Sequence, residues 1–166
     1  MSGLARGALR VQASQTIASY WLPQVLVAFH RAHPGIDVAL GAGNTEQVAN
    51  AVRAGDAELG FVEGRIDDAA LTATPIGKDR LVVVVGPQHP WATKRRFSFE
   101  HLAESEWVLR ERGSGTRSEF EAALRAQGFE PDRLNVALEL PSNEAVRAAV
   151  EGGGVGPHFD SYDVFL

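Results

Sequence analysis

Three short polar segments stand where a predicted strand is followed by a predicted helix. They are Ser14-Gln15-Thr16, Asn44-Thr45 and Ser142-Asn143. The first turn of a helix offers unpaired backbone N–H groups and about half a positive charge, so hydroxyl and amide side chains there can hold a small anion. The same residue types are also the favoured helix caps in any protein. For each segment, both an anion-binding role and a simple capping role stay open.

A fourth candidate is the glycine-containing run Arg110–Arg117. Gly113 and Gly115 allow the backbone to approach a ligand closely, and Ser114 and Thr116 add hydroxyl groups just before a helix. A nucleotide-binding P-loop needs more residues between its glycines and a lysine after the second one, and this run has neither. The run therefore predicts a loop that closes over a ligand, or an ordinary glycine-rich turn, rather than a nucleotide site.

Residue types suited to catalysis or metal binding are sparse. The chain has no cysteine, so it contains no disulfide, zinc–thiolate site or thiol nucleophile. His30 and His33 lie three residues apart near a predicted helix end, but no third ligand follows at a spacing typical of metal sites. No Ser-His-Asp order and no close carboxylate pair stands out. We expect no catalytic residue, no metal and no cofactor.

Composition indicates a globular protein. Of the 166 residues, 45% are hydrophobic and 22% charged, which suits one domain or two small lobes. The net charge of −5 repels nucleic-acid phosphates, so we expect these residues not to bind DNA by themselves. A signal peptide and an apolar run of about 20 residues are both missing, which predicts no membrane contact and a cytoplasmic location. A periplasmic protein stripped of its signal would look the same.

The elements that must position these segments alternate between strand and helix in the first half of the chain. Apolar spacing predicts strands at 9–13, 36–40 and 59–62, with helices at 17–32 and from Thr45 to Gly55. Pro23 predicts a separate or kinked first turn, and 41–44 is predicted as a turn with Thr45 as the next N-cap. Two successive strand–helix–strand units imply parallel strands.

The second half begins after a crossover at Pro75-Ile76-Gly77. The aliphatic run Leu81–Val85 predicts a strand covered on both faces. Further strands are predicted at 107–109 and 136–140. Helices are predicted at 99–103 after Ser98, at 118–127, and after Ser142 as far as the glycines at 152–154.

With these elements in place, the sequence resembles the effector-binding domain of LysR-type transcriptional regulators. The resemblance begins in residues 9–40, LRVQASQTIASYWLPQVLVAFHRAHPGIDVAL, and continues through VRAGDAELG at 52–60. The segments RERGSGTR at 110–117 and SNEAV at 142–146 are similar to the branch of cysteine-metabolism regulators. The resemblance covers about Leu9 to Gly156.

This resemblance implies an α/β, two-lobed fold like the type 2 periplasmic binding proteins, each lobe a mainly parallel sheet flanked by helices. It implies that a small, often anionic metabolite binds in the cleft between the lobes and modulates transcription. It also implies a homodimer or higher homo-oligomer, with DNA bound only through an N-terminal domain outside these residues. The expected effector-binding residues are Ser14, Gln15, Thr16, Asn44, Thr45, Ser114, Thr116 and Asn143.

We expect 1–76 to form the first lobe, 77–156 the second lobe and 157–166 an atypical C-terminal tail. The family's DNA-binding domain and its C-terminal return segment have no counterpart in this sequence. Without the return segment, part of the first lobe's apolar surface is expected to stay uncovered, which predicts marginal stability or association of copies. Two other functions stay open, because fold alone does not fix function: a transporter's solute-binding protein, and an enzyme acting on small acids.

Overall fold

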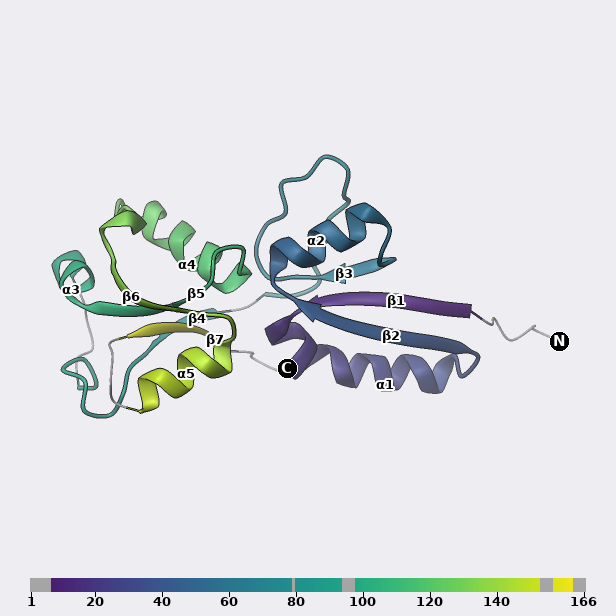
Figure 1. The fold of residues 1–166 in the computed structure, drawn as a ribbon, viewed down its shortest axis with the longest axis horizontal. Helices are drawn as coiled ribbons and strands as arrows, with labels where there is room; N and C mark the ends of the chain where they lie inside the picture. Colours follow the sequence, from purple (N-terminus) through teal and green to yellow (C-terminus); the bar gives the residue numbers. More distant parts are fainter. Residues whose placement is uncertain (1–6, 79, 94–97, 153–156, 163–166) are drawn as a thin grey trace. The chain divides into compact units, whose positions relative to one another are not determined.

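The computed structural model describes residues 7–78, 80–93, 98–152 and 157–162. The chain divides into a first unit, Met1–Lys78, and a second unit, Asp79–Leu166. The division lies close to the expected boundary after Ile76. Both units combine strands and helices in the α/β manner expected from the sequence (Figure 1).

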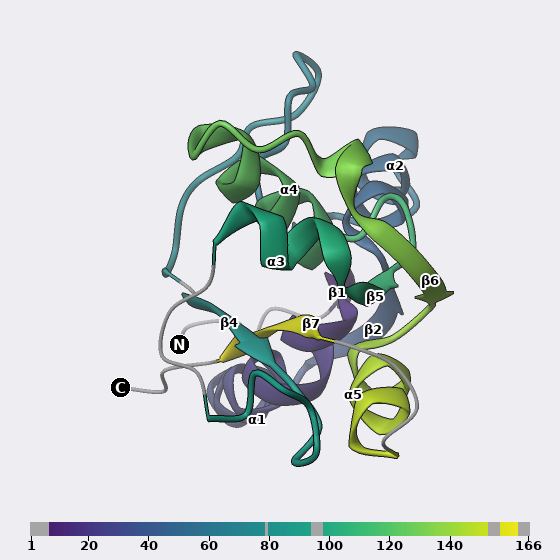
Figure 2. The same cartoon turned by 90° about the vertical axis from the view of Figure 1, so that its left-hand side faces the viewer.

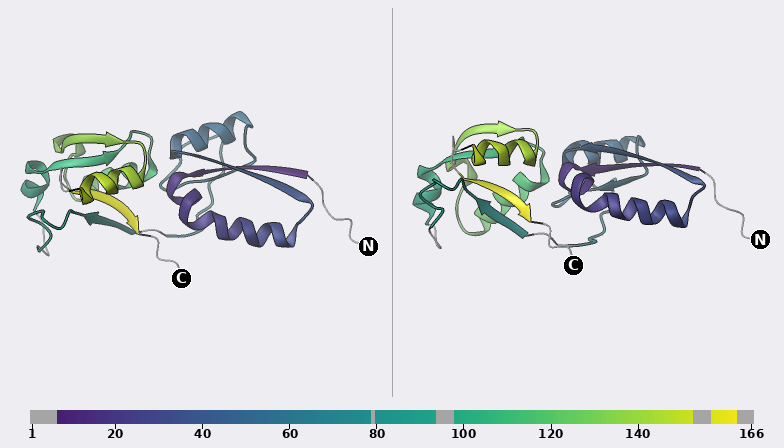
Figure 3. Two further views of the ribbon diagram at one scale, coloured as in Figure 1. Left: turned by 60° about the horizontal axis from the view of Figure 1, so that its bottom comes forward. Right: turned by 90° about the horizontal axis from the view of Figure 1, so that it is seen from below.

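The first unit is a parallel three-stranded sheet with a helix on each face. Its strands are β1 (Gly7–Ser14), β2 (Ile36–Gly43) and β3 (Leu59–Phe61), in the order β2-β1-β3. Both β2 and β3 pair with β1 in parallel, as the strand–helix–strand pattern predicted. Helices α1 (Leu22–Ala32) and α2 (Thr45–Ala54) cover opposite faces (Figure 3).

Packing in the first unit follows the two-residue alternation of β1. Val11 and Ala13 are buried and cluster with Leu22, the first residue of α1. On the other face, Gly60 of β3 lies directly against Val48 and Val52 of α2, where an added Cβ would come within 2.9 Å of both valine side chains. The glycine thus allows the close approach of helix and sheet.

The helical segment after β1 is divided, as Pro23 predicted. Residues Ile17–Trp21 form a π-helical turn, and α1 follows with the proline in its first turn. The proline fits there because the first N–H groups of a helix need no intrahelical partner.

Two sequence expectations are wrong at the end of β2. Residues Gly41–Gly43 belong to the strand and not to a turn, because these positions lie beside bulky amides: a Cβ at Gly41 would come within 2.3 Å of Gln12 Nε2. The N-cap of α2 is Asn44 and not Thr45. Its side chain accepts from Gln47 N at 2.9 Å, while Gln47 Oε1 accepts from Asn44 N at 2.9 Å.

Within its described residues, the second unit contains two strand pairs and three helices. Strands β5 (Glu106–Arg110) and β6 (Asn135–Leu140) pair in parallel, while β4 (Arg80–Val84) and β7 (His158–Tyr162) pair antiparallel (Figure 2). The helices are α3 (Phe99–Glu104), α4 (Gly115–Ala126) and α5 (Asn143–Glu151), with a short 3₁₀ turn at Pro131–Arg133.

Strand β5 is the buried centre of the second unit. Trp107 and Leu109 pack into a cluster with Phe120 of α4, and the intervening Val108 packs with Val146 of α5. The rings of Trp107 and Phe120 have centroids 5.4 Å apart, and Trp107 Nε1 donates to the carbonyl of Leu102 at 2.8 Å. Successive residues of one strand therefore supply two helix interfaces.

Two expectations about the second unit are corrected. The run Leu81–Val85 is half-buried rather than covered on both faces, and α4 begins at Gly115 rather than at Ser118. The tail contributes β7, which pairs with β4. Gly152 ends α5 as expected, whereas Gly153 and Gly154 lie outside the described residues.

Candidate functional site

The strand register of the first unit brings two of the polar segments together. Ser14, the last residue of β1, is aligned with Gly43, the last residue of β2. Ser14-Gln15-Thr16 and Asn44-Thr45 therefore leave the sheet side by side at the carboxyl ends of neighbouring parallel strands. This is the edge at which open α/β sheets bind ligands.

The first of these segments carries buried polar atoms without partners. Ser14 is 3% exposed and Thr16 is 4% exposed. The Ser14 hydroxyl and the Gln15 Oε1 atom are buried and accept or donate no hydrogen bond within the described residues. Buried polar atoms are almost always paired in native proteins, so this hydroxyl and this amide oxygen are candidates to bind a ligand or a water molecule.

The second segment is instead engaged in the structure of the unit. The Thr45 hydroxyl donates to the carbonyl of Glu63 at 3.1 Å, which ties the start of α2 to the chain beyond β3. The Asn44 side chain serves as the cap of α2. Both residues lie at the expected edge, but their hydrogen bonds assign them a supporting role around Ser14.

The second unit repeats the arrangement at β5 and β6. Arg110 and Leu140, the last residues of these strands, are aligned in the register. The helices that follow begin with the expected polar residues, Ser114 and Thr116 at α4 and Asn143 at α5, and all three are buried. The Thr116 Oγ1 atom is buried without a hydrogen-bond partner among the described residues.

Arg110 begins the candidate run Arg110–Arg117 but was not among the expected effector-binding residues. It is 4% exposed, and its guanidinium donates to Asn143 Oδ1 at 2.5 Å and to both carboxylate oxygens of Glu111, at 2.9 and 3.0 Å. Asn143 is therefore bound to an arginine. The available signal was a charged residue ending the apolar run Trp107–Leu109, but an arginine at that position is equally common on a surface.

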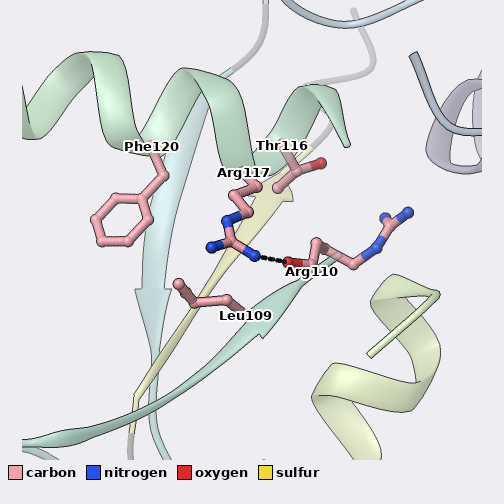
Figure 4. A pocket seen from close by; sticks show the side chains of 5 residues that line it. All are labelled: Leu109, Arg110, Thr116, Arg117 and Phe120. Carbon is pink, nitrogen blue, oxygen red and sulfur yellow. Dashed lines mark hydrogen bonds between the residues drawn. The ribbon is translucent and has the colours of Figure 1, made fainter. Parts of the chain in front are cut away.

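Arg117 fixes the loop between β5 and α4. Its guanidinium donates to the carbonyl of Arg110 at 2.9 Å (Figure 4). It also donates to Glu121 Oε1 at 2.9 Å and to the carboxylate of Glu139. Burial lowers the pKa of Arg117, but the hydrogen bonds to the two carboxylates outweigh this effect, and the pKa is raised overall. Arg117 thus stays charged and holds α4, β5 and β6 together.

A small hollow lies among Leu109, Arg110, Thr116, Arg117 and Phe120 (Figure 4). Its space for a water-sized sphere is about 10 Å³, which is room for a single water molecule. An organic ligand does not fit there without rearrangement of the side chains.

Over the described ranges, no three His, Cys, Asp or Glu side chains gather as metal ligands. A helix of the length and apolar character needed to cross a bilayer is likewise missing from those ranges.

Known proteins are similar to this chain in sequence and in fold. Residues 2–155 match the family described as LysR substrate binding domain. The transcriptional regulator CysL of Bacillus subtilis is 33% identical over 148 residues, which are 89% of this chain and 48% of CysL. Regulator Rv2282c of Mycobacterium tuberculosis is 40% identical over 92% of this chain and 51% of its own. The chain spans about half the length of these curated relatives.

Among solved structures, the CcmR regulatory domain of Synechocystis PCC6803, in complex with 2-PG, is 31% identical with a TM-score of 0.80. The alignment covers 94% of this chain and 73% of the CcmR chain. The effector-binding domain of QuiR, in complex with shikimate, has a TM-score of 0.82 at 16% identity, covering 96% of this chain and 76% of that one, and so supports the fold. The chain therefore belongs to the LysR substrate-binding domains, the ligand-sensing regulatory domains of LysR-type transcriptional regulators.

Proposed function

We propose that the first unit binds the negatively charged group of a small metabolite at Ser14-Gln15-Thr16. The observation that carries the proposal is the buried Ser14 hydroxyl at the carboxyl end of β1, which has no hydrogen-bond partner in the part of the chain that the structure describes. A hydroxyl there can donate to an oxyanion, and the start of the following helical segment adds a favourable dipole. The CcmR domain, which is similar over 94% of this chain, was solved with 2-PG, and this supports a small-molecule ligand here.

The roles of the other candidates follow from their hydrogen bonds. The Gln15 amide has an unpartnered oxygen and can bind a hydroxyl or amine of the ligand. Asn44 and Thr45 hold α2 and the chain beyond β3 in position around Ser14. Ser114, Thr116 and Asn143 of the second unit are the weaker candidates, and contact from both lobes stays a prediction of the resemblance.

In the parent regulator, ligand binding would bias an equilibrium between conformations rather than turn a substrate over. DNA would be bound through a part of the regulator outside these residues, and two or more copies would associate. Such a regulator acts on DNA and would therefore work in the cytoplasm. Incubation with a bound ligand should give no product, and product formation would favour the enzyme alternative instead.

Isothermal titration calorimetry of the chain with sulfate, acetate and 2-PG tests the site. The Ser14→Ala variant should bind the anion that binds best about 10- to 100-fold more weakly, because a hydrogen bond to a charged group is worth about 1.5–3 kcal/mol. Its stability without ligand should be unchanged or higher, since the hydroxyl it loses is buried and unpaired.

Ser19→Ala is the matched control, because Ser19 lies in the same helical segment but is exposed. It should bind as the unmodified chain does. Equal affinity of the Ser14→Ala chain would show that the anion binds elsewhere.

A further inference from the structure

Arg110 and Glu111 form an unusual neighbouring pair at the carboxyl end of β5. The guanidinium and the carboxylate meet fork to fork, with Nε to Oε2 at 2.9 Å and Nη2 to Oε1 at 3.0 Å. This is the geometry in which arginine binds carboxylates, sulfate and phosphate. Glu111 therefore occupies the position that the oxyanion of a ligand would take.

The two partners differ in how easily each can leave the pair. The Arg110 side chain is 4% exposed and is anchored on its other side by Asn143 Oδ1. The Glu111 side chain is 24% exposed and can turn into water, where hydration replaces the contact. A buried guanidinium without a counter-ion is costly, so Arg110 requires an anion even when Glu111 departs.

A second, independent feature faces the same place. Thr116, in the first turn of the 12-residue helix α4, is 3% exposed, and its hydroxyl has no partner among the described residues. Figure 4 shows this hydroxyl and the Arg110 guanidinium on the same side, away from Phe120 and Leu109. The hydroxyl can donate to an anion that the arginine holds.

The other buried arginine of the second unit provides a contrast. Arg117 is bound by acceptors from three elements: the carbonyl of Arg110, Glu121 of its own helix, and Glu139 of β6. If one of these acceptors moves away, the other two still compensate the charge of Arg117. Among the described residues, Arg110 has in contrast one carboxylate partner, supplied by the adjacent residue.

We propose that Glu111 is an internal stand-in for a ligand, and that a small oxyanion binds the second unit by displacing the Glu111 carboxylate from Arg110. The arriving carboxylate or sulfate accepts from the guanidinium and from the Thr116 hydroxyl, while Asn143 positions the guanidinium rather than the ligand. The choice of an anionic ligand rests on the proposed function.

The test is calorimetric titration of the full chain with sodium sulfate, against sodium chloride at equal ionic strength. All variants carry Ser14→Ala, so that the site proposed in the first unit does not contribute. Glu111→Gln removes the internal competitor and should raise sulfate affinity at least 10-fold. Glu139→Gln makes the same change opposite Arg117 and should leave sulfate affinity unchanged.

Two further variants identify the groups that bind the anion. In the Glu111→Gln background, Arg110→Met should abolish the gain in sulfate affinity. Thr116→Val keeps the shape of the side chain and should reduce that gain about 3- to 10-fold. Circular dichroism establishes that each variant is folded, and Thr116→Val supports the test on its own if Arg110→Met does not fold.

Unchanged sulfate affinity of the folded Glu111→Gln chain would overturn the proposal. A gain that persists in Thr116→Val and in Arg110→Met would overturn it as well. The first-unit site is judged separately, from the difference between the unmodified chain and Ser14→Ala alone. Either proposal can therefore fail while the other stands.

Discussion

The two units place polar groups at the same kind of edge but prepare them differently. In the first unit the edge carries neutral groups, the Ser14 hydroxyl and the Gln15 amide oxygen, which have no hydrogen-bond partner among the described residues. In the second unit it carries a formal charge, Arg110, already neutralised by Glu111. The edge of the first unit can bind an anion without breaking an existing contact, whereas at the edge of the second unit Glu111 must first leave Arg110.

The hydrophobic cores of the two units also differ, in how completely they bury large apolar side chains. The main core cluster of the first unit contains Val11, Ala13 and Leu22, and large apolar side chains such as Val27 and Leu59 are about half exposed. The second unit has an aromatic core that includes Trp91, Trp107, Phe120 and Phe129. Because stabilisation grows with buried apolar area, we expect the second unit to be the more stable of the two.

The largest effect is expected from the aromatic core. Trp107→Ala should lower the free energy of unfolding by about 3–5 kcal/mol, because it removes a fully buried ring at the centre of the second unit. Trp21→Ala in the first unit is the matched change at a half-buried ring and should cost clearly less. Urea unfolding followed by circular dichroism measures both, and a larger loss from Trp21→Ala would reverse the comparison of the cores.

A smaller difference in stability is expected between alanine substitutions of two tightly packed glycines, one in each unit. A Cβ at Gly86 in the second unit would come within 2.8 Å of the backbone oxygen of Val150, whereas at Gly60 it would meet valine methyl groups. Methyl groups can shift and a helix carbonyl cannot, so Gly86→Ala should destabilise more than Gly60→Ala, both within about 1–3 kcal/mol. Thermal unfolding compares them with Gly77→Ala, which has open space around it. Equal melting temperatures for the Gly86 and Gly60 variants would contradict this expectation.

The smallest effect concerns acidification. The hydrogen bond from Arg117 lowers the pKa of Glu139 below its ordinary value of 4.5, so this pair stabilises the fold above that pH and loses its contribution as the pH falls through the lowered pKa. Screening by solvent limits the pair to about 0.2–1 kcal/mol. Glu139→Gln should therefore reduce the difference in unfolding free energy between pH 7 and pH 3.

The corresponding pair of the first unit sharpens the comparison. The hydrogen bond from Arg10 lowers the pKa of Glu58 in the same way, with the same sign of pH dependence. Both carboxylates are 44% exposed, but Arg10 is 54% exposed whereas Arg117 is only 8% exposed, so Glu58→Gln should change the pH dependence less than Glu139→Gln does. A larger change in pH dependence from Glu58→Gln than from Glu139→Gln would show that burial of Arg117 does not strengthen its ion pair with Glu139.

Much of the fold follows from local patterns in the sequence. Alternating apolar runs predicted the parallel strands of the first unit, and Pro23 predicted the division of its first helix. These patterns succeed because they reflect the geometry of a single strand or helix. Gly41 and Gly43 misled the interpretation, because glycine occurs both in turns and in strands with large neighbours. Only the tertiary neighbours, Gln12 of β1 beside Gly41 and Gln47 of α2 beside Gly43, decide between the two.

The sequence by itself determined that hydroxyl and amide residues follow successive strands, and parallel pairing then places them at one edge within each unit. Only the tertiary structure decided which of them already have partners. Thr45, Asn44 and Asn143 make hydrogen bonds within the fold, whereas the buried hydroxyls of Ser14 and Thr116 make none with any residue that the structure describes. Hydrogen-bond partners such as Glu63 and Arg110 are distant in sequence, so the register and packing of whole elements determine whether a polar side chain supports the fold or remains available to a ligand.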